Sequence, residues 1–117
     1  MFIDKHSAIW LNISMREEDR PDIYAAVFGA LAHPARRRVL LTIYFNGGSM
    51  TAGEIAAVFT HAWQTTSRHL RVLEEAGLVS TERQGRQRVY RLERKRLNLA
   101  AEWLAHFADE SGPQKGG

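Results

Sequence analysis

The sequence predicts a mainly α-helical domain with one small β-hairpin, and three observations support this fold class. Apolar residues recur at helical spacing in several segments that begin and end at capping residues. Two short runs within residues 79–92 flank a glycine-containing turn, as in a hairpin. A helix with polar and basic residues on one face precedes this hairpin. Helix, turn, helix and basic hairpin in this order predict a winged helix-turn-helix.

The first predicted helix begins at Pro21 and ends before Pro34, because a residue that precedes proline avoids the helical region. Its apolar stripe, spaced i, i+4 and i+8, consists of Ile23, Val27 and Leu31. A second helix is expected from Pro34 to about Phe45, with His33 as its cap and Asn46-Gly47-Gly48 as its end. The residues that this helix is expected to bury are Val39, Leu40, Ile43 and Tyr44.

Thr51 and Glu54 form a capping-box pattern, in which a hydroxyl and a carboxylate satisfy two amides at a helix start. The buried side of this third helix is expected to comprise Ile55, Ala56, Val58 and Phe59. After a turn at residues 60–62, a fourth helix is predicted from about Trp63 to Ala76, and Gly77 supplies its left-handed end. Its inward face is expected to hold Thr66, Leu70, Leu73 and Ala76. Trp63 replaces the usual small polar cap, and we expect it to pack against the preceding turn.

Two strands are predicted at Val79–Arg83 and Gln87–Leu92, followed by a last helix from about Glu93 to Asp109. The apolar stripe of the last helix comprises Leu97, Ala100, Ala101, Leu104 and Ala108, widened by Trp103 and Phe107. We assign residues 21–110 to one domain. Residues 1–20 are interpreted as an N-terminal extension, with Met15 as an alternative natural start, and residues 111–117 as a disordered tail.

The composition is that of one ordinary globular domain, with 117 residues of which 44% are hydrophobic and 25% charged. There is no cysteine, which excludes disulfides and thiolate metal sites and fits a reducing cytoplasm. No apolar stretch approaches the roughly 20 residues of a membrane span, and the N-terminus lacks a signal-peptide pattern. We therefore expect a cytoplasmic protein without a membrane partner.

The positive charge is concentrated in the middle of the chain. Residues 61–96 hold nine Arg and Lys against four Glu, a net charge of +5. Residues 1–33 hold three basic and five acidic residues, and residues 97–117 hold one and three, so each end carries −2. A basic middle that coincides with a helix-turn-helix pattern indicates a surface that faces phosphates.

The fourth helix carries the residues that we expect to read double-stranded DNA, since a major groove about 12 Å wide admits one helix. These residues are Gln64, Thr65, Ser67, Arg68, His69 and Arg71. Gln64 can pair with adenine and Arg68 with guanine, whereas His69 and Arg71 are expected to reach phosphates. From the hairpin, the arginines expected at the minor groove or flanking phosphates are Arg83, Arg86 and Arg88. The alternative interpretation is that Thr66 and Ser67 stabilise turns and that the arginines only increase solubility.

From Tyr24 to Phe107 the chain resembles the ArsR-type winged-helix repressors of bacteria. The resemblance is carried by residues 31–38 (LAHPARRR), 54–56 (EIA), 66–79 (TSRHLRVLEEAGLV) and 85–90 (GRQRVY). It implies a homodimer, built from the first and last helices, that represses transcription by binding a palindromic operator. The broad apolar faces of these two helices independently suggest a partner surface. The expected dimer interface consists of Ile23, Val27, Leu31, Leu97, Ala101, Leu104 and Ala108.

The chain departs from the family's metal sensors. Many members bind metal through cysteines on the helix before the recognition helix, where this chain has Ala56 and Val58. Another family site uses histidine and carboxylates of the last helix, and here Glu102, His106 and Glu110 lie one turn apart. One histidine per subunit favours a solvated polar face over a metal site. The resemblance is to the cysteine-free branch, with no cofactor expected, an unidentified effector, and a metal-responsive repressor as an alternative.

An enzyme is not expected, because the sequence contains no Gly-rich phosphate loop and no spaced set of metal ligands. Ser67 and His69 are two residues apart on a helix, so they point in different directions and cannot form a nucleophile and base. The remaining alternative is a winged-helix module that binds a protein or RNA partner. Polar and basic residues at Gln64, Thr65 and Arg68 favour DNA.

Overall fold

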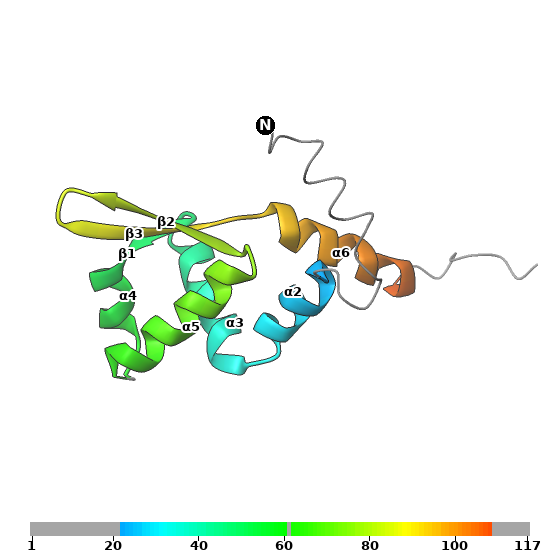
Figure 1. Cartoon of the computed structure of the whole chain (residues 1–117), viewed down its shortest axis with the longest axis horizontal. Coiled ribbons are helices and arrows are strands. Elements are labelled where there is room, and N and C mark those ends of the chain that lie inside the picture. Colours follow the sequence, from blue (N-terminus) through cyan, green and yellow to red (C-terminus); the bar gives the residue numbers. More distant parts are fainter. Residues whose placement is uncertain (1–21, 61, 109–117) are drawn as a thin grey trace, which may run out of the picture.

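The computed structural model describes residues 22–60 and 62–108, and within them five helices accompany one three-stranded antiparallel sheet (Figure 1). The helices are α2 (Ile23–Leu31), α3 (Pro34–Phe45), α4 (Ala52–Val58), α5 (Trp63–Glu75) and α6 (Lys95–Ala108). The strands are β1 (Ser49–Thr51), β2 (Val79–Gln84) and β3 (Gln87–Leu92). The expectations for residues 1–20 and 111–117, and for Glu110, lie outside the described residues.

Helices α2, α3 and α4 begin within two residues of the predicted positions, because capping side chains satisfy their first amides. Asp22 Oδ1 accepts a hydrogen bond from the Ala25 amide at 3.0 Å. His33 Nδ1 accepts one from the Ala35 amide at 3.2 Å, which confirms His33 as the cap of α3. The Thr51 hydroxyl and the Glu54 carboxylate form both bonds of the capping box, at 3.1 and 2.9 Å.

The sheet contains one strand that the sequence did not indicate. Strand β1 pairs with β3, with Met50 opposite Tyr90, so the strand order is β1-β3-β2. A run of three residues is too short to reveal the alternation by which strands are predicted. β1 fixes the start of α4 to the base of the β2–β3 hairpin.

The core lies between α3, α5 and the sheet, and α5 turns its predicted inward face towards it. The fully or nearly fully buried residues include Val39, Ile43, Ile55, Leu70, Leu73 and Leu78. Three expectations were wrong: Tyr44 is 48% exposed, Val58 is 53% exposed, and Ala56 is exposed as well. Helix α4 has only seven residues, so a single face, at Ile55, reaches the core.

Gly77 ends α5 as predicted and directs the chain into the hairpin. Its φ of +79° lies in the left-handed region that favours glycine. The Leu78 amide donates to the Leu73 carbonyl and the Gly77 amide to the Glu74 carbonyl, each at 2.9 Å. This Schellman-type pattern satisfies the last carbonyls of the helix.

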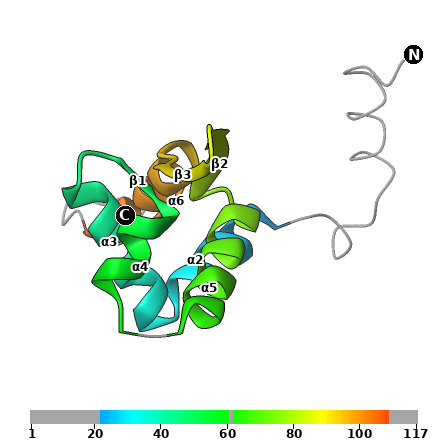
Figure 2. The ribbon, with the colours of Figure 1, turned by 90° about the vertical axis from the view of Figure 1, so that its left-hand side faces the viewer.

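Figures 1 and 2 place the β2–β3 hairpin at one end of the fold, above α4 and α5, and α2 and α6 at the other. Helix α6 continues from β3 and packs against α2. None of the described helices is long and apolar enough to cross a membrane. The arrangement separates a surface built by α5 and the hairpin from a surface built by α2 and α6.

Candidate nucleic-acid interface

Helix α5 turns a polar and basic face to solvent. Gln64, Arg68 and Arg71 are exposed, and their spacing of i, i+4 and i+7 places them on one side of the helix. Thr65 and Ser67 flank this face and are half-buried. Because the opposite side of α5 is fixed in the core, the positions of the exposed side chains are set by the packing of the whole domain.

The N-terminal end of α5 has no side-chain cap. Ala62 precedes the helix and accepts no hydrogen bond through its side chain. The amides of the first turn therefore keep the partial positive charge of a helix N-terminus, which favours an anion nearby. Gln64 and Thr65 belong to this first turn.

The hairpin carries its arginines at paired positions. Arg83 lies directly opposite Arg88, and Gln84 opposite Gln87, so the turn consists of the two residues Gly85 and Arg86. Gly85 has a φ of +63°, as the first residue of a type II′ hairpin turn requires. Like charges directly opposite each other destabilise a sheet, so this pair does not stabilise the hairpin.

A cleft of about 470 Å³ separates α5 from the hairpin and collects these arginines. Its lining residues are Ala52, Trp63, Ser67, Arg71, Glu74, Arg83, Arg86, Arg88 and Tyr90. Four arginines against one glutamate give the cleft a positive charge that suits a phosphate backbone.

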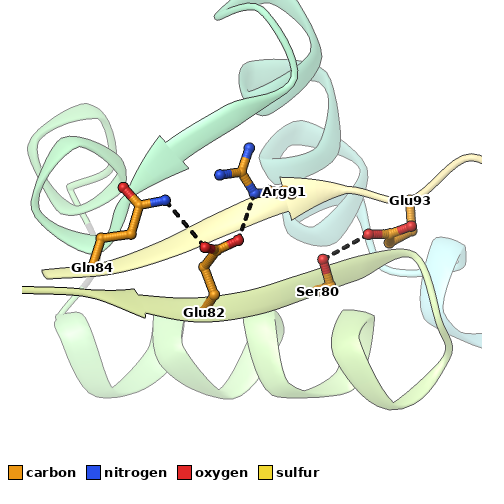
Figure 3. A network of polar contacts seen from close by, with 5 residues as sticks. All are labelled: Ser80, Glu82, Gln84, Arg91 and Glu93. Atoms are coloured by element: carbon orange, nitrogen blue, oxygen red, sulfur yellow. Dashed lines mark hydrogen bonds and ion pairs between the residues drawn. The ribbon is translucent and has the colours of Figure 1, made fainter.

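On the opposite face of the hairpin, the arginine is paired with a carboxylate (Figure 3). Arg91 Nε donates to Glu82 Oε1 at 2.9 Å, and Gln84 Nε2 donates to Glu82 Oε2 at 3.2 Å. These hydrogen bonds, that from Arg91 first, hold the pKa of Glu82 below its usual value. The Ser80 hydroxyl donates to Glu93 Oε2 at 2.6 Å. The uncompensated positive charge of the hairpin therefore lies on the side of α5.

Tyr90 and Glu74 connect the two walls of the cleft. Tyr90 is buried on β3, and this burial raises the pKa of its hydroxyl, while the nearby Arg88 partly opposes the shift. The Thr81 hydroxyl donates to Glu74 Oε2 at 3.2 Å, which joins β2 to α5. Sequence reasoning missed Glu74, Tyr90 and the position of Trp63 in the cleft. The spacing could have indicated Glu74, because it follows Arg71 by three residues and Ser67 by seven.

His69 occupies a different position from the other expected DNA contacts. It is half-buried, and its ring centroid lies 4.6 Å from that of His33. The spacing explains this, since His69 follows the buried Thr66 by three residues and precedes the buried Leu73 by four. Of the six residues expected on α5, it has the least support as a phosphate contact.

The expected dimer-interface residues fall into three groups. Ile23, Ala101, Leu104 and Ala108 are exposed on α2 and α6, Leu31 and Leu97 are half-buried, and Val27 is buried in the chain's own core. Aromatic residues enlarge the exposed group, with ring centroids 5.6 Å apart for Phe28 and Trp103 and 5.0 Å apart for Trp103 and Phe107. Exposed apolar residues therefore gather on α2 and α6.

Of the three polar residues considered for a metal site, Glu102 and His106 lie on α6. Glu102 and His106 are both exposed, and His106 Nδ1 lies 3.2 Å from the Trp103 carbonyl oxygen. Within residues 22–60 and 62–108, no group of three His, Cys, Asp or Glu side chains gathers at a point.

Comparison with known proteins identifies this arrangement. A helix-turn-helix domain model matches residues 31–82. The transcriptional repressor SdpR of Bacillus subtilis (strain 168) is 34% identical over 84 residues, which cover 72% of this chain and 91% of that protein. The crystal structure of an ArsR family transcriptional regulator is similar with a TM-score of 0.66 at 32% identity, covering 77% of this chain and 91% of that chain.

A third similarity concerns the fold alone. The solution structure of a homodimeric winged helix-turn-helix DNA-binding domain from Mycobacterium bovis has a TM-score of 0.59 at 23% identity, covering 98% of each chain. Sequence identity, coverage and the order of the elements agree, and the chain therefore belongs to the ArsR family of winged helix-turn-helix transcriptional regulators.

Proposed function

We propose that this protein is a transcriptional repressor that binds a palindromic DNA operator as a homodimer. The observation that carries the proposal is the one-sided charge of the hairpin: Arg83, Arg86 and Arg88 line a cleft beside α5, whereas Arg91 on the other side is paired with Glu82. If the arginines served only solubility, we would expect no difference in pairing between the face towards α5 and the opposite face. A DNA backbone that enters the cleft would neutralise it.

Recognition of the base sequence is assigned to the exposed face of α5. Gln64 and Arg68 lie in its first two turns, where side chains reach base edges when a helix enters the major groove. Arg71 lines the cleft and is assigned to a phosphate, together with the hairpin arginines. Thr65, Ser67 and His69 complete the proposed interface.

Dimerisation is assigned to the apolar surface of α2 and α6, which comprises the exposed Ile23, Ala101, Leu104 and Ala108 and the half-buried Leu31 and Leu97. Trp103 and Phe107 lie on the same surface and would bury large areas against a second copy. A two-fold pair would present two α5 helices to half-sites about 34–36 Å apart. Repression would follow in the cytoplasm, because a bound dimer excludes polymerase from an overlapping promoter.

The proposal is tested by selecting binding sites from a library of random DNA duplexes with the full chain. We expect enrichment of a palindrome with half-sites one helical turn apart. Fluorescence anisotropy then compares the selected duplex with a scrambled duplex of equal composition at two salt concentrations. Affinity for both should fall with salt, since phosphate contacts release counterions, while a preference for the selected duplex persists.

Two results would contradict the proposal. Equal affinity for selected and scrambled duplexes would leave a basic surface without sequence recognition. Enrichment of a single, asymmetric half-site, together with sedimentation of the protein as a monomer, would contradict the proposed homodimer.

A further inference from the structure

An apolar groove of about 430 Å³ lies apart from the DNA-binding cleft. Five leucines and Tyr44 line it, contributed by the end of α2, the outer side of α3, the end of β3 and the start of α6. Its volume falls within the range of pockets that hold small molecules, roughly 300–1,000 Å³. The proposed contacts to DNA use no residue of this groove, and its lining shares only the half-buried Leu31 and Leu97 with the proposed dimer surface.

The groove leaves large apolar side chains in contact with water. Leu41 is 56% exposed, and Tyr44, one turn further along α3, is also exposed. Leu40, Leu92 and Leu97 lie deeper and belong to or pack against the core. Such a gathering of apolar residues around a concave surface favours burial by an apolar ligand or partner.

Among the described residues, the charged side chains that line the groove are two arginines, and their positions indicate the charge of the occupant. Arg37 Nη1 donates to the Leu31 carbonyl at 2.8 Å, which leaves its other N–H groups for a ligand. The Arg94 guanidinium lies 5.7 Å from the centroid of the Tyr44 ring. Among the described residues, neither arginine forms a salt bridge with a carboxylate. A guanidinium recognises a carboxylate through two parallel hydrogen bonds.

We propose that this groove binds an amphipathic carboxylate, with the apolar chain against the leucines and the carboxylate on Arg37 and Arg94, and that such a ligand alters DNA affinity. The second half rests on the proposed function. The groove spans α3, which packs against α5, and the start of α6. Arg94 lies between the end of β3 and the start of α6, so a ligand held there would fix the hairpin relative to α6.

The test uses the full chain and decanoate below its micellar concentration, with decanol as the uncharged equivalent, in titration calorimetry without DNA. We expect decanoate to bind at least about tenfold more tightly than decanol, as a charge-assisted hydrogen-bonded pair implies. Arg37→Gln and Arg94→Gln should each weaken decanoate binding about tenfold and leave decanol binding unchanged. Arg38→Gln is the matched control, because Arg38 is exposed on the same helix and does not line the groove.

Equal affinity for decanoate and decanol, or an equal loss in Arg38→Gln, would overturn the site. A change of oligomeric state in Leu41→Glu on sedimentation would assign the groove to a second copy and would also overturn it. Decanoate should shift the affinity for the selected duplex several-fold, and an unchanged affinity would overturn the regulatory half. Because calorimetry needs no DNA, failure of the operator proposal would leave the binding result interpretable.

Discussion

Arg96 on α6 donates a hydrogen bond from Nη1 to the carbonyl oxygen of Ala76, at 3.2 Å, and so joins α6 to the C-terminal end of α5. The carbonyls at a helix C-terminus carry partial negative charge, which a guanidinium stabilises. The helix proposed to form the dimer is thereby connected to the helix proposed to read DNA.

Arg96→Ala should lower the free energy of unfolding by about 1–2 kcal/mol, since it removes a charge-assisted hydrogen bond at a partly buried helix end. Lys95→Ala is the control, because Lys95 is the exposed neighbour at the start of α6. Urea unfolding of the two variants provides the measurement. Equal effects of the two substitutions would mean that the contact with Ala76 contributes nothing to stability.

Gly77→Ala should destabilise the protein for two separable reasons. Its φ of +79° is strained for alanine, and an added Cβ would lie 2.7 Å from Cδ of Arg96. Gly47→Ala isolates the strain, because Gly47 ends α3 with the same pair of backbone hydrogen bonds and has a φ of +91° with no atom within 4 Å of an added Cβ. Strain alone costs about 1–2 kcal/mol, so Gly77→Ala should cost more than Gly47→Ala.

The same substitution in an Arg96→Ala background distinguishes these reasons further. Removing the arginine side chain creates the space that the added Cβ needs, so the extra cost of Gly77→Ala should disappear there. If Gly77→Ala lowered the free energy of unfolding equally with and without Arg96, the clash would make no contribution. Backbone strain would then explain the whole effect.

The contrast between Gly77 and His69 indicates how far the sequence could predict this molecule. Gly77 was predictable, because the residue type alone specifies a left-handed helix end. The capping box at Thr51 and Glu54, the hairpin turn and the inward face of α5 follow equally from local chemistry and spacing. These features account for the helices, the hairpin and the identity of the exposed residues on α5.

Features that depend on contacts between distant segments could not be predicted. The packing of His69 against His33 joins residues far apart in the chain, whereas the sequence suggested a phosphate contact for His69. Likewise, the charge balance of the hairpin depends on register: Arg91 is paired only because Glu82 lies on the same face of β2. The sequence shows how many arginines the hairpin contains, but only the structure shows which of them is paired with a carboxylate.

Tyr90→Phe should reduce the loss of stability at alkaline pH. Burial raises the pKa of Tyr90 above its ordinary value of 10.0, so in the folded state the hydroxyl keeps its proton to a higher pH. The stabilisation this provides is complete below the unfolded pKa and is lost as pH rises above it and through the folded value. The free energy of unfolding, measured from pH ~8 to ~11, should therefore fall more steeply with pH for the native chain than for the variant. Parallel curves would mean that Tyr90 does not contribute.

Leu104→Glu should produce monomers, because it places a charge on the apolar surface of α2 and α6. Leu104 is exposed in the single chain, so the substitution should leave the stability of the monomer nearly unchanged. Val58→Glu, at a similarly exposed apolar residue on α4, should leave the dimer intact. Sedimentation velocity measures both variants, and an unchanged dimer in Leu104→Glu would move the interface elsewhere.

Arg68→Ala and Arg86→Ala should weaken DNA binding in different ways, because Arg68 lies on the outer face of α5 and Arg86 at the hairpin turn. Arg68→Ala should cost about 1–3 kcal/mol on the selected duplex and relax the preference for one base pair. Arg86→Ala should weaken selected and scrambled duplexes alike and reduce the salt dependence by about one phosphate contact. Anisotropy titrations on both duplexes at several salt concentrations separate these effects. If both variants lost affinity uniformly, Arg68 would be a backbone contact, and base recognition would pass to Gln64 and its neighbours in the first turn of α5.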